Sequence, residues 1–335
     1  MTAPEFDPQP DELSLALVEG ARRRISSQVR RTPTVSAPSL AALLGRPVTA
    51  KLELLQHSGS FKVRGAFNRM LQLSAAERAR GVVAVSGGNH GIGVAAAAGA
   101  LHVRATVVMP ATTPATSLAT ARGHGAEVIL CDTIGEAFRR ADELAATGLT
   151  VIHPFDDPDV IAGQGTLGLE LIEDAPEITD VIASIGGGGM ISGVITAVRA
   201  LRPDIRIWGV ETEGAAAMTR ARAAGHPVEL DAITSIAKTL GAPSVSARTL
   251  EIVSGAVEDV IVVPDSEAVA AIETLADALN VITEPAAACT WAAAQRIRNR
   301  LPADAHVGLV LCGGNVSLED IIGWRTRFAG DPAAG

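Results

Sequence analysis

Residues 181–198 read VIASIGGGGMISGVITAV, a stretch of 18 positions without a charged side chain. An apolar stretch of this length lies near the lower limit for crossing a membrane as a helix. Four consecutive glycines, Gly186, Gly187, Gly188 and Gly189, interrupt it, and glycine weakens a helix at every position it occupies. We therefore expect a buried strand, a glycine-rich turn and a helix here, and no membrane span.

The same order of short apolar run, turn and amphipathic segment recurs along the chain. It predicts an α/β fold with open, twisted, mostly parallel sheets and helices on both faces. The expected strands are residues 82–85, 106–109, 127–130, 181–184, 206–210, 260–263 and 307–311, and the clearest expected helices are 134–146, 190–202, 266–279 and 286–300.

Three glycine-rich turns directly follow expected strands. Gly87-Gly88 follows residues 82–85, the four glycines follow 181–184, and Gly313-Gly314 follows 307–311. Open parallel sheets bind their ligands at the carboxyl ends of their strands. The placement of these turns therefore favours an enzyme that binds a small molecule.

The composition excludes several other classes of protein. With 335 residues, 47% hydrophobic and 19% charged, the chain can bury a sizeable core in two domains. A net charge of −9 and only 3% aromatic residues argue against a nucleic-acid partner. Cys131, Cys289 and Cys312 are few and far apart, which predicts neither a disulfide framework nor a zinc site and favours the cytoplasm.

Lys62 is one of only 3 lysines in a chain that otherwise uses arginine, and it lies in SFKVRGA, residues 60–66. Arginine stays protonated, whereas a lysine amine can lose its proton and form an imine with an aldehyde. Ser60 is placed to cap a helix that begins at Lys62, and the positive end of that helix would lower the pKa of the ammonium. The alternative is an ordinary surface lysine, which its rarity and its motif disfavour.

The four-glycine turn suits a phosphate group. Backbone amides without side chains can surround a phosphate at the start of the following helix; a plain tight turn is the alternative. A dinucleotide site is disfavoured although Glu211 ends the next strand, because Ile191 and Ser192 stand where the two possible registers of the fingerprint require glycine or alanine.

These motifs, with SGGNHG at residues 86–91 and CGGN at 312–315, resemble the threonine/serine dehydratase (ammonia-lyase) branch of the fold-type II pyridoxal-phosphate enzymes, serine racemase-like relatives included. The resemblance runs from about Arg31 to Val316. It implies a fold like tryptophan synthase β, pyridoxal 5'-phosphate as cofactor, and a homodimer. It also implies a large cofactor-binding domain of residues 1–70 and 158–330, a small domain of 71–157, and a disordered tail of 331–335.

The resemblance also implies roles for individual residues. Lys62 would hold the cofactor covalently and take the α-proton of the substrate, and Asn89 would hydrogen-bond the cofactor's 3-hydroxyl. For His90 a structural role is favoured over that of a general base. The remaining expected contacts are Phe61 and the amides of Gly186, Gly187, Gly188, Gly189 and Met190 for the cofactor, and Ser86, Gly87, Asn89 and His90 for the substrate carboxylate.

Cys312 would face the pyridine nitrogen of the cofactor by the same resemblance; a small buried hydrophobe is the alternative. A thiol with a pKa near 8.5 cannot keep that nitrogen protonated as a carboxylate would. The ring is then a weaker electron sink, which suits eliminations. Glu211 stands where racemase-like relatives bind a divalent cation, but the partnering acidic position is Ala217, so no metal is expected. The motifs at 153–156 and 163–166 match the dehydratases, and we assign them packing rather than chemistry.

The expected reaction is β-elimination of water from L-threonine and/or L-serine to give a 2-oxo acid and ammonia. The alternatives are an amino-acid racemase, a dehydratase of 3-hydroxyaspartate or phenylserine, a nicotinamide oxidoreductase, and a silent binding module. Lys238 could reach an acidic substrate. Racemisation needs a proton donor on each face of the α-carbon, and Gly87 stands where the serine racemases that this sequence resembles have a second serine. Dehydration should therefore exceed racemisation.

Overall fold

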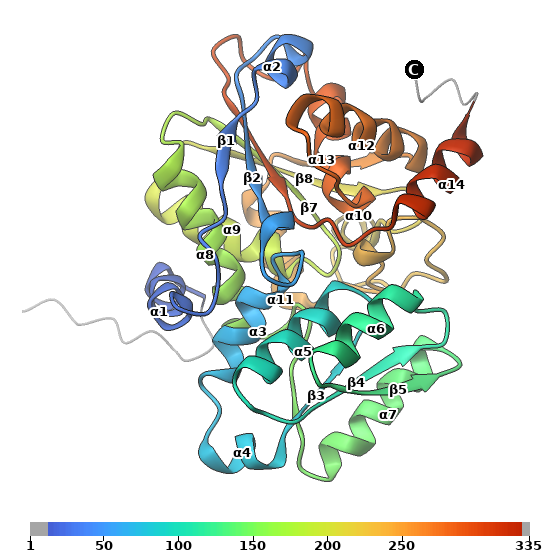
Figure 1. The fold of residues 1–335 in the computed structure, drawn as a ribbon. Coiled ribbons are helices and arrows are strands. Elements are labelled where there is room, and N and C mark those ends of the chain that lie inside the picture. The colour runs from blue at the N-terminus through green and yellow to red at the C-terminus, as the bar shows by residue number, and fades with distance from the viewer. Residues whose placement is uncertain (1–12, 330–335) are drawn as a thin grey trace, which may run out of the picture.

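The computed structural model describes residues 13–329, which form two sheets with helices packed on both faces (Figure 1). The larger sheet has six strands in the order β1-β2-β10-β7-β8-β9, parallel except for the β1–β2 pair. The smaller sheet has four parallel strands in the order β5-β4-β3-β6. The strands are β1 (Thr34–Ser36), β2 (Val48–Leu52), β3 (Val82–Val85), β4 (Ala105–Pro110), β5 (Glu127–Cys131), β6 (Thr150–Val151), β7 (Asp180–Ser184), β8 (Arg206–Thr212), β9 (Asp259–Val263) and β10 (Val307–Leu311).

Figure 1 shows the small sheet with α5 and α6 over one face and α7 over the other, below the large sheet and its helices. The α-helices are α1 (Leu15–Ile25), α2 (Pro38–Leu44), α3 (Lys62–Met70), α4 (Ala75–Arg80), α5 (Asn89–Ala100), α6 (Ala115–Gly123), α7 (Ile134–Ala146), α8 (Pro158–Asp174), α9 (Gly189–Leu201), α10 (Ala217–Ala224), α11 (Ala247–Ala256), α12 (Asp265–Leu279), α13 (Pro285–Arg296) and α14 (Leu318–Phe328), with 3-10 turns η1 (Glu53–Leu55) and η2 (Lys238–Leu240).

The predicted α/β fold with mostly parallel sheets is confirmed, and all seven expected strands are present. Three short strands were not predicted, namely β1, β2 and β6. The helix expected at 286–300 ends at Arg296, and the residues after it turn toward Leu301-Pro302, where proline disfavours a helical residue before it. The expected tail at 331–335 lies outside the described residues.

The glycine-interrupted stretch is a strand and a helix, as expected. β7 ends at Ser184 and α9 begins at Gly189, and α9 has only 13 residues. Within residues 13–329 no helix is both long and apolar enough to cross a membrane. Instead β7 is a central strand of the large sheet, and residues of β7 and α9 are buried in one hydrophobic core.

Helix α3, which begins at Lys62, connects the two cores. Its side chains Val63, Phe67 and Met70 pack into the core of the small sheet, while the helix also lies against α8 of the larger part. The hydrophobic effect thus fixes α3 between the two sheets. A lysine at its first position is therefore held at the junction between them.

A group of buried charges fixes the other side of α3. The Arg64 guanidinium donates to both carboxylate oxygens of Glu53 and both of Glu170, each at 2.8 Å. Lys51 on β2 lies 2.7 Å from Glu170. These four side chains carry two positive and two negative charges and are almost entirely buried. Removing one partner of such a group costs about 3–5 kcal/mol because an uncompensated charge remains, so α3 is held firmly beside β2 and α8.

Candidate active site

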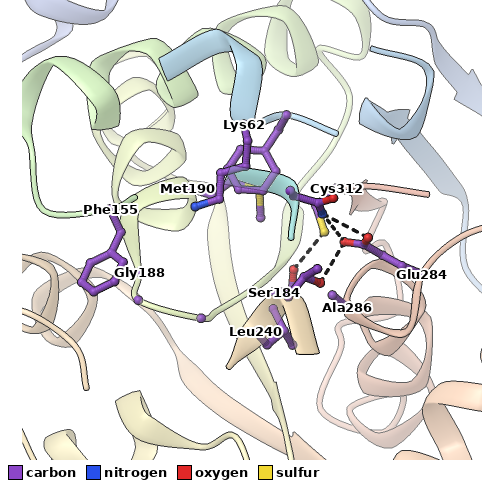
Figure 2. Close-up of a pocket in the computed structure, with 15 residues that line it drawn as sticks. Lys62, Phe155, Ser184, Gly188, Met190, Leu240, Glu284, Ala286 and Cys312 are labelled. Carbon is purple, nitrogen blue, oxygen red and sulfur yellow. Dashed lines mark hydrogen bonds between the residues drawn. The ribbon is translucent and has the colours of Figure 1, made fainter. Parts of the chain in front are cut away.

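A pocket opens where loops from both sheets meet, beyond the carboxyl ends of β3, β7 and β10. Its empty volume is about 450 Å³ counted out to its open mouth, a size typical of small-molecule sites. Figure 2 shows Phe155 and Gly188 at one end, Glu284 at the other, and Lys62 and Cys312 between them. The lining residues are Phe61, Lys62, Asn89, Phe155, Ser184, Gly186, Gly187, Gly188, Gly189, Met190, Thr239, Leu240, Glu284, Ala286 and Cys312.

Lys62 lies in the pocket, and no carboxylate of residues 13–329 lies within hydrogen-bonding distance of its Nζ. Its Nζ donates to the carbonyl oxygen of Pro154 at 2.7 Å. Burial of the ammonium lowers the pKa of Lys62 to about 8, although the nearby Cys312 and Glu284 act in the opposite direction. A substantial fraction of the amine is therefore neutral near physiological pH, as a lysine nucleophile requires.

The expectation that Ser60 caps α3 is wrong. Phe61 is the N-cap residue and makes no side-chain cap hydrogen bond, and the Ser60 hydroxyl has no partner among the described residues. The backbone positions this segment instead, because Phe61 N–H donates to the Cys312 carbonyl at 3.0 Å and Ser60 forms a β-bridge with Gly313. Burial, rather than a serine cap, is thus the main cause of the lowered Lys62 pKa.

The four-glycine turn has no room for side chains. A Cβ atom on Gly187 would lie 2.2 Å from the Phe155 ring, and one on Gly189 would lie 2.8 Å from the Phe155 Cα. Gly188 has a φ of +92°, which L residues with side chains rarely adopt. Since the first amides of a helix have no acceptor within it, the start of α9 offers free N–H groups beside the pocket. This turn fits a phosphate group.

Cys312 follows β10 and is almost completely buried. Its Sγ accepts a hydrogen bond from the Ser184 hydroxyl at 3.5 Å. Burial raises the pKa of the Cys312 thiol far above its usual range. The group is therefore a neutral thiol at the floor of the pocket, and it cannot act there as a carboxylate would.

Glu284 is the main pocket residue that the sequence analysis did not find. Asn89 Nδ2 donates to its two carboxylate oxygens at 2.8 and 3.0 Å, and the Thr239 hydroxyl donates to one of them at 3.0 Å. Asn315 Nδ2 donates to Asn89 Oδ1 at 2.7 Å. Burial raises the pKa of Glu284 to about 7 despite these hydrogen bonds. The only signal in the sequence is its place before Pro285 and an apolar helix.

Three residues expected to bind the substrate lie outside the lining of the pocket. The Ser86 hydroxyl accepts from Gly88 N–H at 3.1 Å, and Ser86, Gly87 and Gly88 form a half-buried turn before α5. The His90 ring is buried, with Nε2 at 2.8 Å from the Ile152 carbonyl. Burial lowers the pKa of His90 to about 3, so its ring serves packing, and only its backbone belongs to the first turn of α5.

Glu211 on β8 is also buried, but its carboxylate binds the first turn of α10 and does not line the pocket. Its oxygens accept from the backbone N–H groups of Met218 and Thr219, each at 2.8 Å, and from the Thr219 hydroxyl at 2.6 Å. Burial raises its pKa to about 7. Among residues 13–329 no group of three His, Cys, Asp or Glu side chains is arranged to hold a metal ion.

The segment 153–156 contributes more to the site than packing alone. The Pro154 carbonyl holds Lys62, and the Phe155 ring covers the four-glycine turn. His153 Nδ1 accepts from the backbone of Asp156 at 2.7 Å, which shapes this segment. A backbone carbonyl leaves no mark on residue type, so sequence patterns cannot reveal the contact with Lys62.

Comparisons with known proteins agree with this geometry. The family model described as pyridoxal-phosphate dependent enzyme matches residues 25–313. An L-threonine ammonia-lyase from Thermotoga maritima is 37% identical over 312 residues, which are 92% of this chain and 77% of the relative. A phenylserine dehydratase from Ralstonia pickettii is 40% identical over 302 residues, covering 90% of this chain and 93% of the relative.

A solved structure extends the similarity to the fold. The structure of maize serine racemase superimposes with a TM-score of 0.88 and 34% sequence identity, covering 95% of this chain and 97% of that one. The three proteins carry different names for their reactions, so the similarity alone does not identify the substrate.

Proposed function

The chain belongs to the pyridoxal-phosphate-dependent enzymes and within them is a dehydratase of the ammonia-lyase type; we propose that its substrates are L-threonine and/or L-serine. The overall reaction removes water from a 3-hydroxy amino acid and, after hydrolysis, releases a 2-oxo acid and ammonia. The observation that carries this proposal is the pairing of a lysine amine of lowered pKa with a neutral thiol in one pocket.

The pocket residues fit pyridoxal phosphate. The amides of the four-glycine turn and Met190 would hold its phosphate, and Asn89 its 3-hydroxyl, with Phe61 packed beside Lys62. Lys62 supplies the amine for covalent attachment, and Cys312 would lie against the pyridine nitrogen. When bound, the cofactor supplies an electron sink for the bond that breaks at the α-carbon.

Lys62 is the proposed base for the α-proton. Its amine is close to half neutral at pH 8 because of burial, and the Pro154 carbonyl orients Nζ by accepting one of its hydrogens. A base with a pKa near the working pH combines availability with driving force. Within residues 13–329 no side chain lies at hydrogen-bonding distance from Nζ, so no second side-chain base stands beside it.

Cys312 favours elimination because its thiol carries no charge. Burial keeps its thiol neutral. A neutral thiol would leave the pyridine nitrogen of the cofactor uncharged and would therefore stabilise a free carbanion only weakly. Loss of the 3-hydroxyl together with the α-proton avoids that carbanion. Racemisation needs both a longer-lived carbanion and a second proton donor, and Gly87 has no side chain to serve as one.

A longer substrate is the second candidate. Lys238 is exposed on η2, next to Thr239, which lines the pocket. An ammonium there could bind the distal carboxylate of 3-hydroxyaspartate, whereas phenylserine would need apolar space in the same region. The relative that is named a phenylserine dehydratase makes both worth testing.

We also propose a cytoplasmic homodimer with the domain division expected from the sequence. The cytoplasm is supported by three cysteines that are all buried and unpaired. A dimer is supported by Leu318 and Ile322, which lie one turn apart on α14 and are 64% and 63% exposed. The division at residues 71–157 is supported by the small sheet, whose strands all fall within it.

A substrate panel tests the proposal. Purified protein with cofactor is incubated with L-threonine, L-serine, 3-hydroxyaspartate and phenylserine, and 2-oxo acid, ammonia and the inverted amino acid are measured. We expect oxo acid and ammonia in equal amounts from threonine or serine, with only traces of inversion by chiral chromatography. Inversion faster than oxo-acid release would replace the dehydratase with a racemase, and preference for 3-hydroxyaspartate that is lost in Lys238→Ala would identify the longer substrate.

A further inference from the structure

Thr113 has a buried hydroxyl without a hydrogen-bond partner. The residue lies in the loop between β4 and α6, where its backbone N–H donates to the Pro110 carbonyl at 2.9 Å. Its side chain is 8% exposed, while its neighbours Thr112 and Pro114 are exposed. Its Oγ1 has no partner within residues 13–329. Buried hydroxyls are nearly always hydrogen-bonded, so this exception calls for an explanation.

The Thr113 hydroxyl fills the space that a side chain on residue 87 would use. A Cβ atom built on Gly87 would lie 2.3 Å from Thr113 Oγ1, 3.3 Å from Thr113 Cβ and 3.4 Å from Pro110 Cδ. A carbon and an oxygen cannot approach to 2.3 Å without bonding, so positions 87 and 113 cannot both carry these groups in their present places. This chain has glycine at position 87, and the Thr113 hydroxyl fills the space that a side chain there would take.

The surroundings of Gly87 are suited to an anion. The Ser86–Gly88 turn leads into α5, whose first N–H groups have no acceptor within the helix, and the positive end of that helix favours negative charge. The turn also faces the pocket, because a Cβ atom on Gly88 would lie 3.3 Å from Cγ2 of Thr239, a lining residue. An unpaired hydroxyl beside free amides at the pocket rim is typical of a site for a carboxylate.

We propose that Thr113 is a substrate-binding residue whose hydroxyl donates a hydrogen bond to the α-carboxylate of the amino acid bound at the Ser86–Gly88 turn. The inference rests on the proposed function, since it takes an amino acid as the ligand. In this arrangement the hydroxyl reaches the carboxylate from the β4–α6 loop, in the place where a serine at residue 87 would present its own. Substrate binding then gives the buried hydroxyl the partner that it lacks.

Binding of two non-reacting amines separates a carboxylate contact from simple packing. L-alanine and ethylamine differ only in the carboxylate, and each is titrated against the holoenzyme by the change in cofactor absorbance. Removing a hydrogen bond to a charged group should weaken L-alanine binding to Thr113→Val by about tenfold to a hundredfold. Ethylamine binding should change by less than about twofold, and Thr113→Ser should keep L-alanine binding within about threefold, since it keeps the hydroxyl. Cofactor content and melting temperature control for folding.

Moving the hydroxyl from one position to the other gives a second, independent test. Thr113→Ala should bind L-alanine more weakly, and for L-threonine or L-serine it should raise KM more than it lowers kcat. Thr113→Ala combined with Gly87→Ser should recover part of the lost L-alanine affinity. Gly87→Ser alone should bind worse than the double variant, because its side chain meets the Thr113 hydroxyl.

Three outcomes would overturn the proposal: equal weakening of L-alanine and ethylamine in Thr113→Val, no weakening of either, or a wild-type protein that binds both equally. Each would make Thr113 a space-filling residue. Failure of the wild type to release oxo acid from any 3-hydroxy amino acid would instead remove the dehydratase proposal, and the two amines would still decide the role of Thr113.

Discussion

Two buried glutamates, Glu211 and Glu284, share a pKa raised to about 7 by burial, yet their surroundings differ. Glu211 is the second-last residue of β8 and accepts hydrogen bonds from residues 218 and 219, at the start of the next helix. Glu284 precedes α13 and accepts from Asn89 and Thr239, which come from distant parts of the chain. One carboxylate completes a local turn, and the other joins three segments around the pocket.

A shifted pKa therefore shows first that a group is buried, and it does not by itself show that the group takes part in the reaction. The backbone amides that bind Glu211 are fixed in a helix and cannot reorient when the charge on Glu211 changes. The side chains that bind Glu284 can reorient, and Lys62 is close enough for its charge to act on Glu284. We therefore expect changes near Glu284 to alter the reaction and changes at Glu211 to alter stability.

Lys62→Ala should have the largest effect. The variant loses both the amine that holds the cofactor and the proposed base, so turnover should fall by about three orders of magnitude or more, as for other catalysts that lose a covalent nucleophile. The cofactor absorbance that depends on covalent attachment should disappear, which a spectrum after gel filtration measures. Lys238→Ala is the matched control and should keep both the absorbance and the turnover of L-threonine or L-serine; retention of both by Lys62→Ala would remove the whole site assignment.

Cys312 variants should have the next largest effect. Cys312→Ser replaces one neutral group with another, so activity should stay within about tenfold. Cys312→Asp places a carboxylate where burial now keeps a thiol neutral, and it should lower dehydration by about a hundredfold if the loss of one well-placed electrostatic match costs near 2.7 kcal/mol. Oxo-acid release measures both. Similar activities for Ser and Asp would make Cys312 a packing residue.

Glu284→Gln and Glu211→Gln test the comparison directly. Glu284→Gln should lower kcat/KM by about tenfold, equivalent to roughly 1.4 kcal/mol, because an amide cannot accept from Asn89 at both of its terminal atoms. Glu211→Gln should leave kcat/KM within about threefold but lose about 1–3 kcal/mol of unfolding free energy, since a helix N–H would lose its acceptor. Denaturant titrations and initial rates decide, and the reverse pattern would show that the partners do not indicate the role.

The parts of the site that could be predicted are those that one segment of chain determines. Strand, glycine turn and helix are neighbours in sequence, so Gly186–Gly189 and the strands around it could be recognised. Glu284 could not, because its partners Asn89 and Thr239 lie far away in the chain. Thr113 was missed for the same reason, since its contact with Gly87 exists only when β3 and β4 pair.

The failures in the fold have local physical causes. β1 and β6 have only 3 and 2 residues, too short for a pattern to show. β2 contains Lys51, whose burial depends on Glu170 in α8, and a charge inside an expected strand argues against it. The Ser60 cap failed because Phe61 is the N-cap residue, so Ser60 lies one position too early, and a β-bridge to Gly313 holds it there, a contact between segments that no helix-start rule includes.

The lowered pKa of Lys62 should appear in how the cofactor-free protein captures pyridoxal phosphate. With a pKa of about 8, the neutral amine rises about tenfold between pH 7 and 9 and then levels, whereas an ordinary lysine near 10.4 would rise about a hundredfold. Stopped-flow absorbance gives the rate, and Nα-acetyl-lysine corrects for ionisation of the aldehyde. Glu284→Gln should move the levelling point to lower pH, since Glu284 raises the Lys62 pKa, and Glu211→Gln should not.

Divalent cations should have the smallest effect, because the carboxylate of Glu211 is already occupied. A cation there would have to displace the Met218 and Thr219 N–H groups and the Thr219 hydroxyl, and position 217 offers alanine rather than a second carboxylate. A ligand present at a hundred times its dissociation constant stabilises a protein by about 2.7 kcal/mol, so a real site would raise the melting temperature visibly. We expect Mg²⁺, Ca²⁺ and EDTA to leave melting temperature and rate unchanged in the wild type.

Ala217→Asp is the matched variant, since it supplies the missing carboxylate, and stabilisation by Mg²⁺ in that variant alone would show that Ala217 accounts for the difference. Stabilisation of the wild type, lost in Glu211→Gln, would show instead that Glu211 leaves its helix to bind metal, and the comparison with Glu284 would no longer hold.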